Sequence, residues 1–209
     1  MKKWLLLIPG FVLVFVLVAC GDNNESSETD GMNDKTTEKS DADNASPSKV
    51  DGIGEDEDED LLIVKVDLMD SSGDSIGTAE LTEKDEGVQV KLNAKGVPEG
   101  THGIHFHEVG TCEVPDFESA GGHFNPADSS HGLDHKEGPH AGDLPNLNVG
   151  KDGEVNEEFL AEHVTLKSGE ENSLLQEGGT ALIIHAEADD GKTQPSGDSG
   201  NRILCGVIE

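Results

Sequence analysis

Between residues 61 and 209, short segments of alternating apolar and polar residues are separated by turn residues. Alternation with a period of two is typical of β-strands that bury one face, so the pattern predicts strands and not helices. We expect eight strands, at 61–69, 76–82, 88–94, 101–108, 147–149, 155–160, 180–186 and 203–208. Glycine-containing turns between them favour an all-β antiparallel sandwich or barrel.

Two long connections interrupt this pattern, at 109–146 and 187–201. Connections of that length inside a compact domain usually carry function. We find no internal repeat and no long amphipathic helix in the sequence. The domain is therefore predicted to be a β-scaffold with two functional loops.

The N-terminus has a different pattern. Lys2 and Lys3 precede an apolar run at 4–19, which is too short for a membrane span but suits a secretory signal. The run ends with Ala19 directly before Cys20, which resembles the bacterial lipoprotein box. The resemblance implies a signal peptide at 1–19, a lipid on Cys20, and an extracytoplasmic protein anchored to the bacterial cell membrane. The alternative is an ordinary signal peptide that contains a cysteine.

Residues 21–60 contain 15 acidic residues, three lysines and almost nothing apolar. Such a segment cannot bury enough surface to offset its ordering entropy, and its like charges repel. We predict that 20–60 comprises the lipidated cysteine and a disordered acidic tether, and that 61–209 is the folded domain. An acidic arm that collects metal ions is the alternative interpretation of the tether.

The charge balance excludes some partners. The chain has 14 Lys and Arg against 44 Asp and Glu, a formal net charge of −30. This excess argues against nucleic acid or an anionic lipid surface as a partner for the whole molecule. Membrane contact is therefore expected to come from the lipid on Cys20.

The histidines are the strongest chemical signal, because seven of the nine lie between His102 and His140. His105 and His107 are two apart on a predicted strand, so both imidazoles can reach one ion. Imidazole suits copper and zinc, and three imidazoles with one carboxylate suit tetrahedral zinc. A zinc-buffering histidine-rich loop is an alternative, and clustering alone does not say which ligands share an ion. The further candidate ligands are His123, His131, His140, Asp143 and His185.

Six segments resemble the copper–zinc superoxide dismutase family and follow the family's order. They are 103–108 (GIHFHE), 121–126 (GGHFNP), 131–132 (HG), 140–144 (HAGDL), 185–190 (HAEADD) and 200–207 (GNRILCGV). The resemblance implies an eight-stranded Greek-key β-barrel that converts superoxide to oxygen and hydrogen peroxide with copper and zinc. It also allows a homodimer, and the sequence does not select an association face.

The resemblance implies a role for each candidate ligand. Copper would be held by His105, His107, His123 and His185, and zinc by His123, His131, His140 and Asp143. The shared His123 would bridge both ions, and its copper-side nitrogen would accept and return a proton in each cycle. Without the resemblance to this family, the residues indicate a metal-binding cluster but do not assign individual ligands to copper or zinc.

The family pattern adds four residues around the metals. Asp189 would accept hydrogen bonds from His105 and His131, and Arg202 would attract the superoxide anion. Without the family, Asp189 would be interpreted as a turn residue and Arg202 as part of a surface ion pair. Cys112 and Cys205 would form a disulfide, which leaves Cys20 for the lipid.

Three histidines are not expected to bind metal. His102 corresponds to a structural histidine of the family, His135 matches no family role, and His163 follows the predicted strand 155–160 and is expected to be exposed. The alternative function for the whole domain is a non-catalytic surface carrier of copper and zinc, and Arg202 speaks against it.

The acidity of the domain generates a kinetic prediction. Residues 61–209 carry nine basic and 29 acidic residues, and the 187–201 connection has Lys192 as its only basic residue. Steering of an anion requires positive local potential, and salt screens exposed charges beyond about 10 Å at 0.1 M. We expect kcat/KM for superoxide to rise as ionic strength increases, measured at constant pH. A steep fall would contradict a repulsive field.

Overall fold

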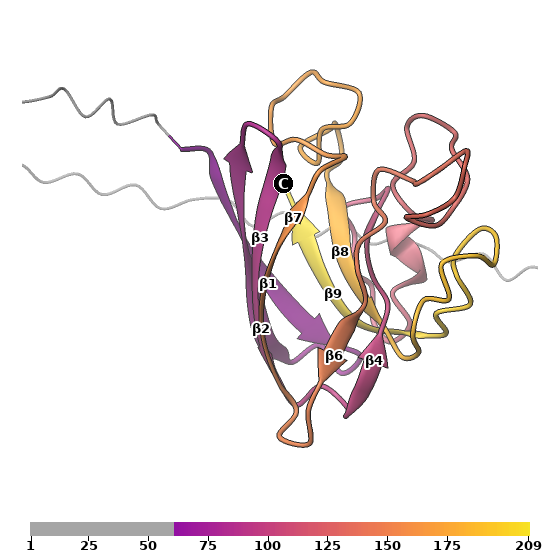
Figure 1. Ribbon diagram of the computed structural model, residues 1–209. Coiled ribbons are helices and arrows are strands. Elements are labelled where there is room, and N and C mark those ends of the chain that lie inside the picture. The colour runs from indigo at the N-terminus through magenta and orange to yellow at the C-terminus, as the bar shows by residue number, and fades with distance from the viewer. Residues whose placement is uncertain (1–60) are drawn as a thin grey trace, which may run out of the picture. The chain divides into compact units, whose positions relative to one another are not determined.

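The computed structural model describes residues 61–209, which form a curled antiparallel β-barrel (Figure 1). Seven strands form one sheet in the order β5-β8-β9-β1-β2-β3-β7, and β4 pairs with β6 in a second sheet. A single 3-10 turn, η1 (Glu118–Ala120), is the only helical element in this part of the chain. The strands are β1 (Ile63–Asp70), β2 (Ser75–Lys84), β3 (Gly87–Lys95), β4 (Gly100–His102), β5 (Ile104–His107), β6 (Leu147–Val149), β7 (Glu154–Ala161), β8 (Thr180–His185) and β9 (Arg202–Ile208).

The alternation of apolar and polar residues in the sequence corresponds to side chains that face the inside and the outside of the barrel. On β3, Val88, Val90 and Leu92 are completely buried, whereas Lys91 between them is exposed. The antiparallel register places Val90 opposite the buried Leu81 of β2, so apolar side chains from neighbouring strands face the same core. Burial of these side chains out of water is the main driving force for the fold.

The predicted strand 101–108 is two strands, which is why nine are observed where eight were expected. It divides at Gly103, so that β4 pairs with β6 and β5 pairs with β8 in the larger sheet. If β4 and β5 are counted as one strand that passes from one sheet to the other, the domain has the eight strands expected of the Greek-key barrel. β5 also differs from an ordinary surface strand, because all four of its residues are buried.

The two predicted long connections lie on the same side of the barrel in Figure 1. Hydrogen bonds join their backbones and side chains directly, as between His131 and Gln194. A third long connection, at 162–179 between β7 and β8, also follows from the predicted strands, but it was not among the two singled out from the sequence. Its buried residues Val164, Leu166 and Leu174 belong to the main core, so it serves as packing.

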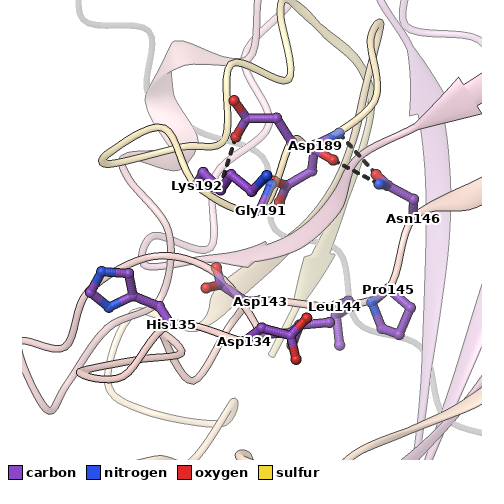
Figure 2. Close-up of a pocket in the computed structure, with 11 residues that line it drawn as sticks. Asp134, His135, Asp143, Leu144, Pro145, Asn146, Asp189, Gly191 and Lys192 are labelled. Carbon is purple, nitrogen blue, oxygen red and sulfur yellow. Dashed lines mark hydrogen bonds between the residues drawn. The ribbon is translucent and has the colours of Figure 1, made fainter.

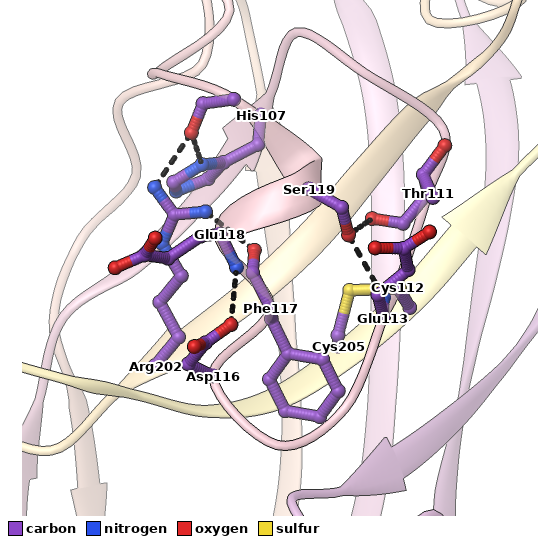
Figure 3. The surroundings of a disulfide bond; sticks show 11 residues. His107, Thr111, Cys112, Glu113, Asp116, Phe117, Glu118, Ser119, Arg202 and Cys205 are labelled. Atoms are coloured by element: carbon purple, nitrogen blue, oxygen red, sulfur yellow. Dashed lines mark hydrogen bonds between the residues drawn. A yellow bond between two sulfur atoms is a disulfide. The ribbon is translucent and has the colours of Figure 1, made fainter. Parts of the chain in front are cut away.

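Cys112 and Cys205 form a disulfide, which confirms the predicted pairing (Figure 3). The bond joins the first long connection to β9 across a sequence separation of 93 residues. In the chain-entropy model, closing a loop of this size stabilises the fold by about 4–5 kcal/mol. Phe117 and Ile183 pack beside Cys205 in a small second core, which holds the start of the connection on the barrel.

The predicted signal peptide, Cys20 and the acidic tether lie outside the described residues. Within residues 61–209, no helix combines the length and the apolar character that crossing a bilayer requires.

Candidate metal centre

Strand β5 supplies the framework of the site. His105 and His107 project from it, and β8, which ends at His185, pairs with it. The first long connection runs along the other edge of β5, where His107 pairs with His123 and His105 with Asp143. Backbone hydrogen bonds hold this connection in place, as in Phe124 N–H to Phe106 O at 2.8 Å. A loop of nearly forty residues is thereby fixed to the strand that carries two of the histidines.

The structure brings the predicted ligands together in two groups that share His123. The donor atoms within each group all lie within 4.8 Å of one another. The four-histidine group consists of His105, His107, His123 and His185. The three-histidine–aspartate group consists of His123, His131, His140 and Asp143.

The three-histidine–aspartate group has the dimensions of a tetrahedral zinc site. The Nδ1 atoms of His123, His131 and His140 lie 3.0, 3.0 and 3.2 Å from Oδ1 of Asp143. Nδ1 of His123 and His140 are 3.4 Å apart. Tetrahedral zinc with bonds of about 2.0–2.1 Å separates its ligand atoms by about 3.3 Å. The group therefore fits zinc without rearrangement.

The backbone fixes which oxygen of Asp143 faces this group. Oδ2 accepts hydrogen bonds from the N–H groups of Gly132 at 2.9 Å and His140 at 3.1 Å. Oδ1 is therefore left to face the three ring nitrogens.

The four-histidine group contains two unpaired buried nitrogens. Nδ1 of His105 and Nε2 of His123 are buried and have no hydrogen-bond partner. An unsatisfied buried polar atom costs about 1–3 kcal/mol, so two in one group require an explanation. Nε2 of His107 and Nε2 of His185 lie 3.4 Å apart beside them. Four imidazole nitrogens suit copper, and an ion there would satisfy both unpaired atoms.

Acceptors outside the groups orient the rings. Asp189 accepts hydrogen bonds from Nε2 of His105 at 2.7 Å and from Nε2 of His131 at 3.0 Å, as the family resemblance implied. Nδ1 of His107 faces the carbonyl of Gly121, and Nδ1 of His185 faces that of Gly200. Because a carbonyl or carboxylate accepts only from N–H, the nitrogens of His105, His107 and His185 that face these acceptors carry the proton, and the other ring nitrogen of each offers its lone pair to the four-histidine group.

The electrostatics keep His123, His185 and Asp143 in their metal-binding forms, but they favour the protonated form of His131. Burial lowers the pKa of His123 to about 4 and that of His185 to about 3, so both are neutral at neutral pH. Burial opposes the charge on Asp143, but hydrogen bonds from His123, His131 and His140 hold its pKa well below the usual value. Burial also disfavours charged His131, yet Asp143 and Asp189 raise its pKa to about 9, so a bound ion must displace that proton.

Arg202 lies at the open side of the four-histidine group. It lines the same pocket as His107, His123 and His185. Its guanidinium donates to the carbonyls of Phe117 and Gly121, and the Gly121 carbonyl is the one that also faces His107 (Figure 3). A fixed, permanently charged donor is thus placed where a small anion can approach the four histidines.

The three histidines expected to be non-ligands lie outside both groups. The ring nitrogens of His102 face the carbonyls of His185 and Pro98 at 2.8 and 2.9 Å, which ties the ends of two strands together. Nδ1 of His135 accepts the N–H of Glu137, and His163 is exposed.

Sequence reasoning missed Asn146, which fixes the backbone of Asp189. Its Nδ2 donates to the Asp189 carbonyl at 2.8 Å, and its Oδ1 accepts the Asp189 N–H at 2.9 Å. Figure 2 shows the two residues joined by this pair of hydrogen bonds in the wall of a pocket that Asp143 also lines. An asparagine in a loop gives no signal of this contact, because its partner lies 43 residues away.

Comparisons with known proteins agree with this geometry. The sequence model of the copper/zinc superoxide dismutase (SODC) family matches residues 75–208. "Superoxide dismutase [Cu-Zn] 2" of Aquifex aeolicus is 52% identical over 148 residues, covering 70% of this chain and 86% of the relative.

Solved structures show the same similarity. A double mutant of a SOD-like protein from Bacillus subtilis has a TM-score of 0.67 at 47% identity, covering 69% of this chain and 95% of that one. The Cu/Zn superoxide dismutase from Brucella abortus has a TM-score of 0.58 at 30% identity, covering 71% and 100%.

Gly197 provides a test of the Asp189 bridge, that is, of the hydrogen bonds that the Asp189 carboxylate accepts from His105 and His131. A Cβ at this residue would overlap the carboxylate of Asp189 and Nε2 of His131, so Gly197→Ala should displace the bridge. Loss of such an outer contact typically weakens metal binding about 10- to 100-fold. We expect that decrease in zinc affinity, measured by competition with a chelator.

Gly169→Ala is the matched control. Gly169 lies in the 162–179 connection, which contributes no residue to either metal group; its φ is +89°, and a Cβ there meets no atom within 4 Å. This variant therefore also places an alanine in the left-handed region, while the contacts of Asp189 are unchanged. Equal zinc affinities for the two variants would contradict the proposed role of the bridge.

Proposed function

Because this chain belongs to the copper/zinc superoxide dismutase family, and is a superoxide dismutase that uses copper and zinc, we propose that its two metal ions share His123 and that it works outside the cytoplasm. The family model covers the barrel from β2 to β9 and both of its metal-facing connections. The shared ring and the location are the additional steps of the proposal.

The position of His123 carries the proposal for the shared ring. Its Nδ1 belongs to the three-histidine–aspartate group, 3.0 Å from Oδ1 of Asp143. Its Nε2 is one of the two unpaired buried nitrogens of the four-histidine group. One imidazole thus offers a nitrogen to each group. When bound, copper supplies one-electron redox chemistry and zinc holds the shared ring.

The protein's own residues handle the anion and the protons. The reaction converts two superoxide anions and two protons into one oxygen and one hydrogen peroxide. Arg202 binds and orients each anion beside the four histidines. Nε2 of His123 holds a proton in one half of the cycle and releases it to the reduced product in the other, while Nδ1 stays in the zinc group. Asp189 prevents His105 and His131 from rotating during these steps.

Arg202 separates a catalyst from a carrier. Replacing it removes the fixed positive charge, so Arg202→Ala should lower kcat/KM about 10- to 100-fold with copper and zinc content unchanged. Lys192→Ala, which removes a positive charge outside this pocket, should have a much smaller effect. Elemental analysis and superoxide removal by the metal-loaded protein measure both quantities.

Two results would overturn this function. In the first, wild-type protein binds one copper and one zinc but removes superoxide no faster than free copper does; the protein would then be a metal carrier and not a catalyst. A crystal structure of the loaded protein in which the ring of His123 contacts only one ion would exclude the shared site.

The location rests on the sequence before the described residues. The run 4–19 and the pair Ala19–Cys20 support secretion, lipidation of Cys20 and anchoring at the outer face of the cytoplasmic membrane. There the enzyme would remove superoxide that arrives from outside or forms at the membrane surface. Its acidic chain would be held at the membrane by lipid alone.

Substitution of Cys20 tests the anchor. In a bacterial host, wild-type protein should partition into detergent with a mature N-terminus at Cys20, and Cys20→Ala should remain in the aqueous phase or keep residues 1–19. Mass spectrometry of the N-terminus and phase separation measure this. Identical partitioning and processing of the two proteins would exclude lipidation at Cys20.

A further inference from the structure

Gln194, in the 187–201 connection, contacts the backbone of His131 at both of its polar atoms. The His131 N–H donates to Oε1 of Gln194 at 2.8 Å, and Nε2 of Gln194 donates to the His131 carbonyl at 2.9 Å. The two residues are 63 positions apart in the sequence. The carboxamide thus takes the place of a neighbouring strand's peptide group and satisfies both backbone groups of a completely buried residue.

His131 is held from both long connections. Its ring lies between Asp143 of the first connection and Asp189 of the second, each 3.0 Å away. Gln194, also in the second connection, holds its backbone. The second connection therefore determines both where the ring of His131 points and where its Cα lies.

A similar contact runs in the opposite direction. Asn146, at the end of the first connection, holds both backbone groups of Asp189 in the second. Gln194 of the second connection holds both backbone groups of His131 in the first. Asp189 and His131 are also hydrogen-bonded to each other. The first connection therefore fixes the backbone of Asp189, and the second connection fixes the backbone of His131.

We propose that Gln194 is a positioning residue for the zinc ligand His131 and controls how long zinc is retained. The inference rests on the zinc site of the proposed function. A histidine on a loop must otherwise lose backbone and side-chain freedom when zinc binds, and that entropy opposes binding. The two hydrogen bonds of Gln194 fix the loop beforehand, so that Nδ1 of His131 already faces the three other donors.

Gln194→Met tests the proposal, because methionine has a similar length but makes neither hydrogen bond. The full chain is loaded with copper and zinc, and zinc release to an excess of a chromogenic chelator is followed at constant pH. We expect release about 10-fold faster or more, since outer contacts of metal ligands typically change affinity by about 10- to 100-fold.

Gln89→Met is the matched control. Gln89 is on β3 and makes one side-chain bond to the backbone, from Nε2 to the carbonyl of Phe159 at 3.1 Å. Its strand lies far from β5 and β8 in the sheet order. Zinc release from this variant should stay within about twofold of wild type.

A spectroscopic readout separates positioning from general stability. Cobalt(II) placed in the zinc site has visible absorption bands that depend on ligand geometry. Gln194→Met should change these bands, whereas Gln89→Met should leave them as in wild type. A role of Gln194 in stability alone would lower the melting temperature without changing the bands.

Each outcome has a defined meaning. Wild-type release rates and cobalt bands in Gln194→Met overturn the inference, whereas a wild-type protein that retains no zinc overturns the proposed zinc site instead. If Gln194→Met does not fold, Gln194→Glu is measured in the same way. It keeps the acceptor for the His131 N–H and loses the donor at neutral pH, so unchanged release and unchanged bands in this variant also overturn the inference.

Discussion

The orientation of the His123 ring is the constraint on which the centre depends. One nitrogen of this ring must face Asp143 and the other must face the four-histidine group, so neither position nor rotation is free. A buried imidazole with an unpaired nitrogen is unfavourable by itself. The surrounding structure therefore has to hold the ring in place. It does so by pairing the His123 backbone with that of His107 on β5.

Much of the barrel core is formed by strands that carry no member of either metal group, so it stabilises the fold whether or not metal is bound. Strands β1, β2 and β3 bury their apolar faces far along the sheet from β5, and they contribute no metal ligand. The disulfide and the small core around Phe117 attach the first long connection to β9. That attachment also places the Phe117 carbonyl under Arg202, so the same contacts that stabilise the connection position the anion-binding group.

The two metal groups are coupled through more than His123. Asp189 contacts one ligand of each group, His105 and His131, and it lies in the connection that also holds Gln194. In this chain all the ligand positions, Asp189 and Arg202 are present and lie together.

The sequence by itself determined the strands, because residues two apart on an extended chain face the same side whatever the fold. It therefore placed His105 and His107 on the same face of one strand. Family resemblance, and not periodicity, supplied the shared His123, the Asp189 bridge and the disulfide. Only the tertiary structure revealed the division at Gly103 and the contacts of Asn146 and Gln194. Those contacts join residues 43 and 63 positions apart in the sequence. They form only because the two long connections pack against each other on the barrel, and no local sequence pattern encodes that packing.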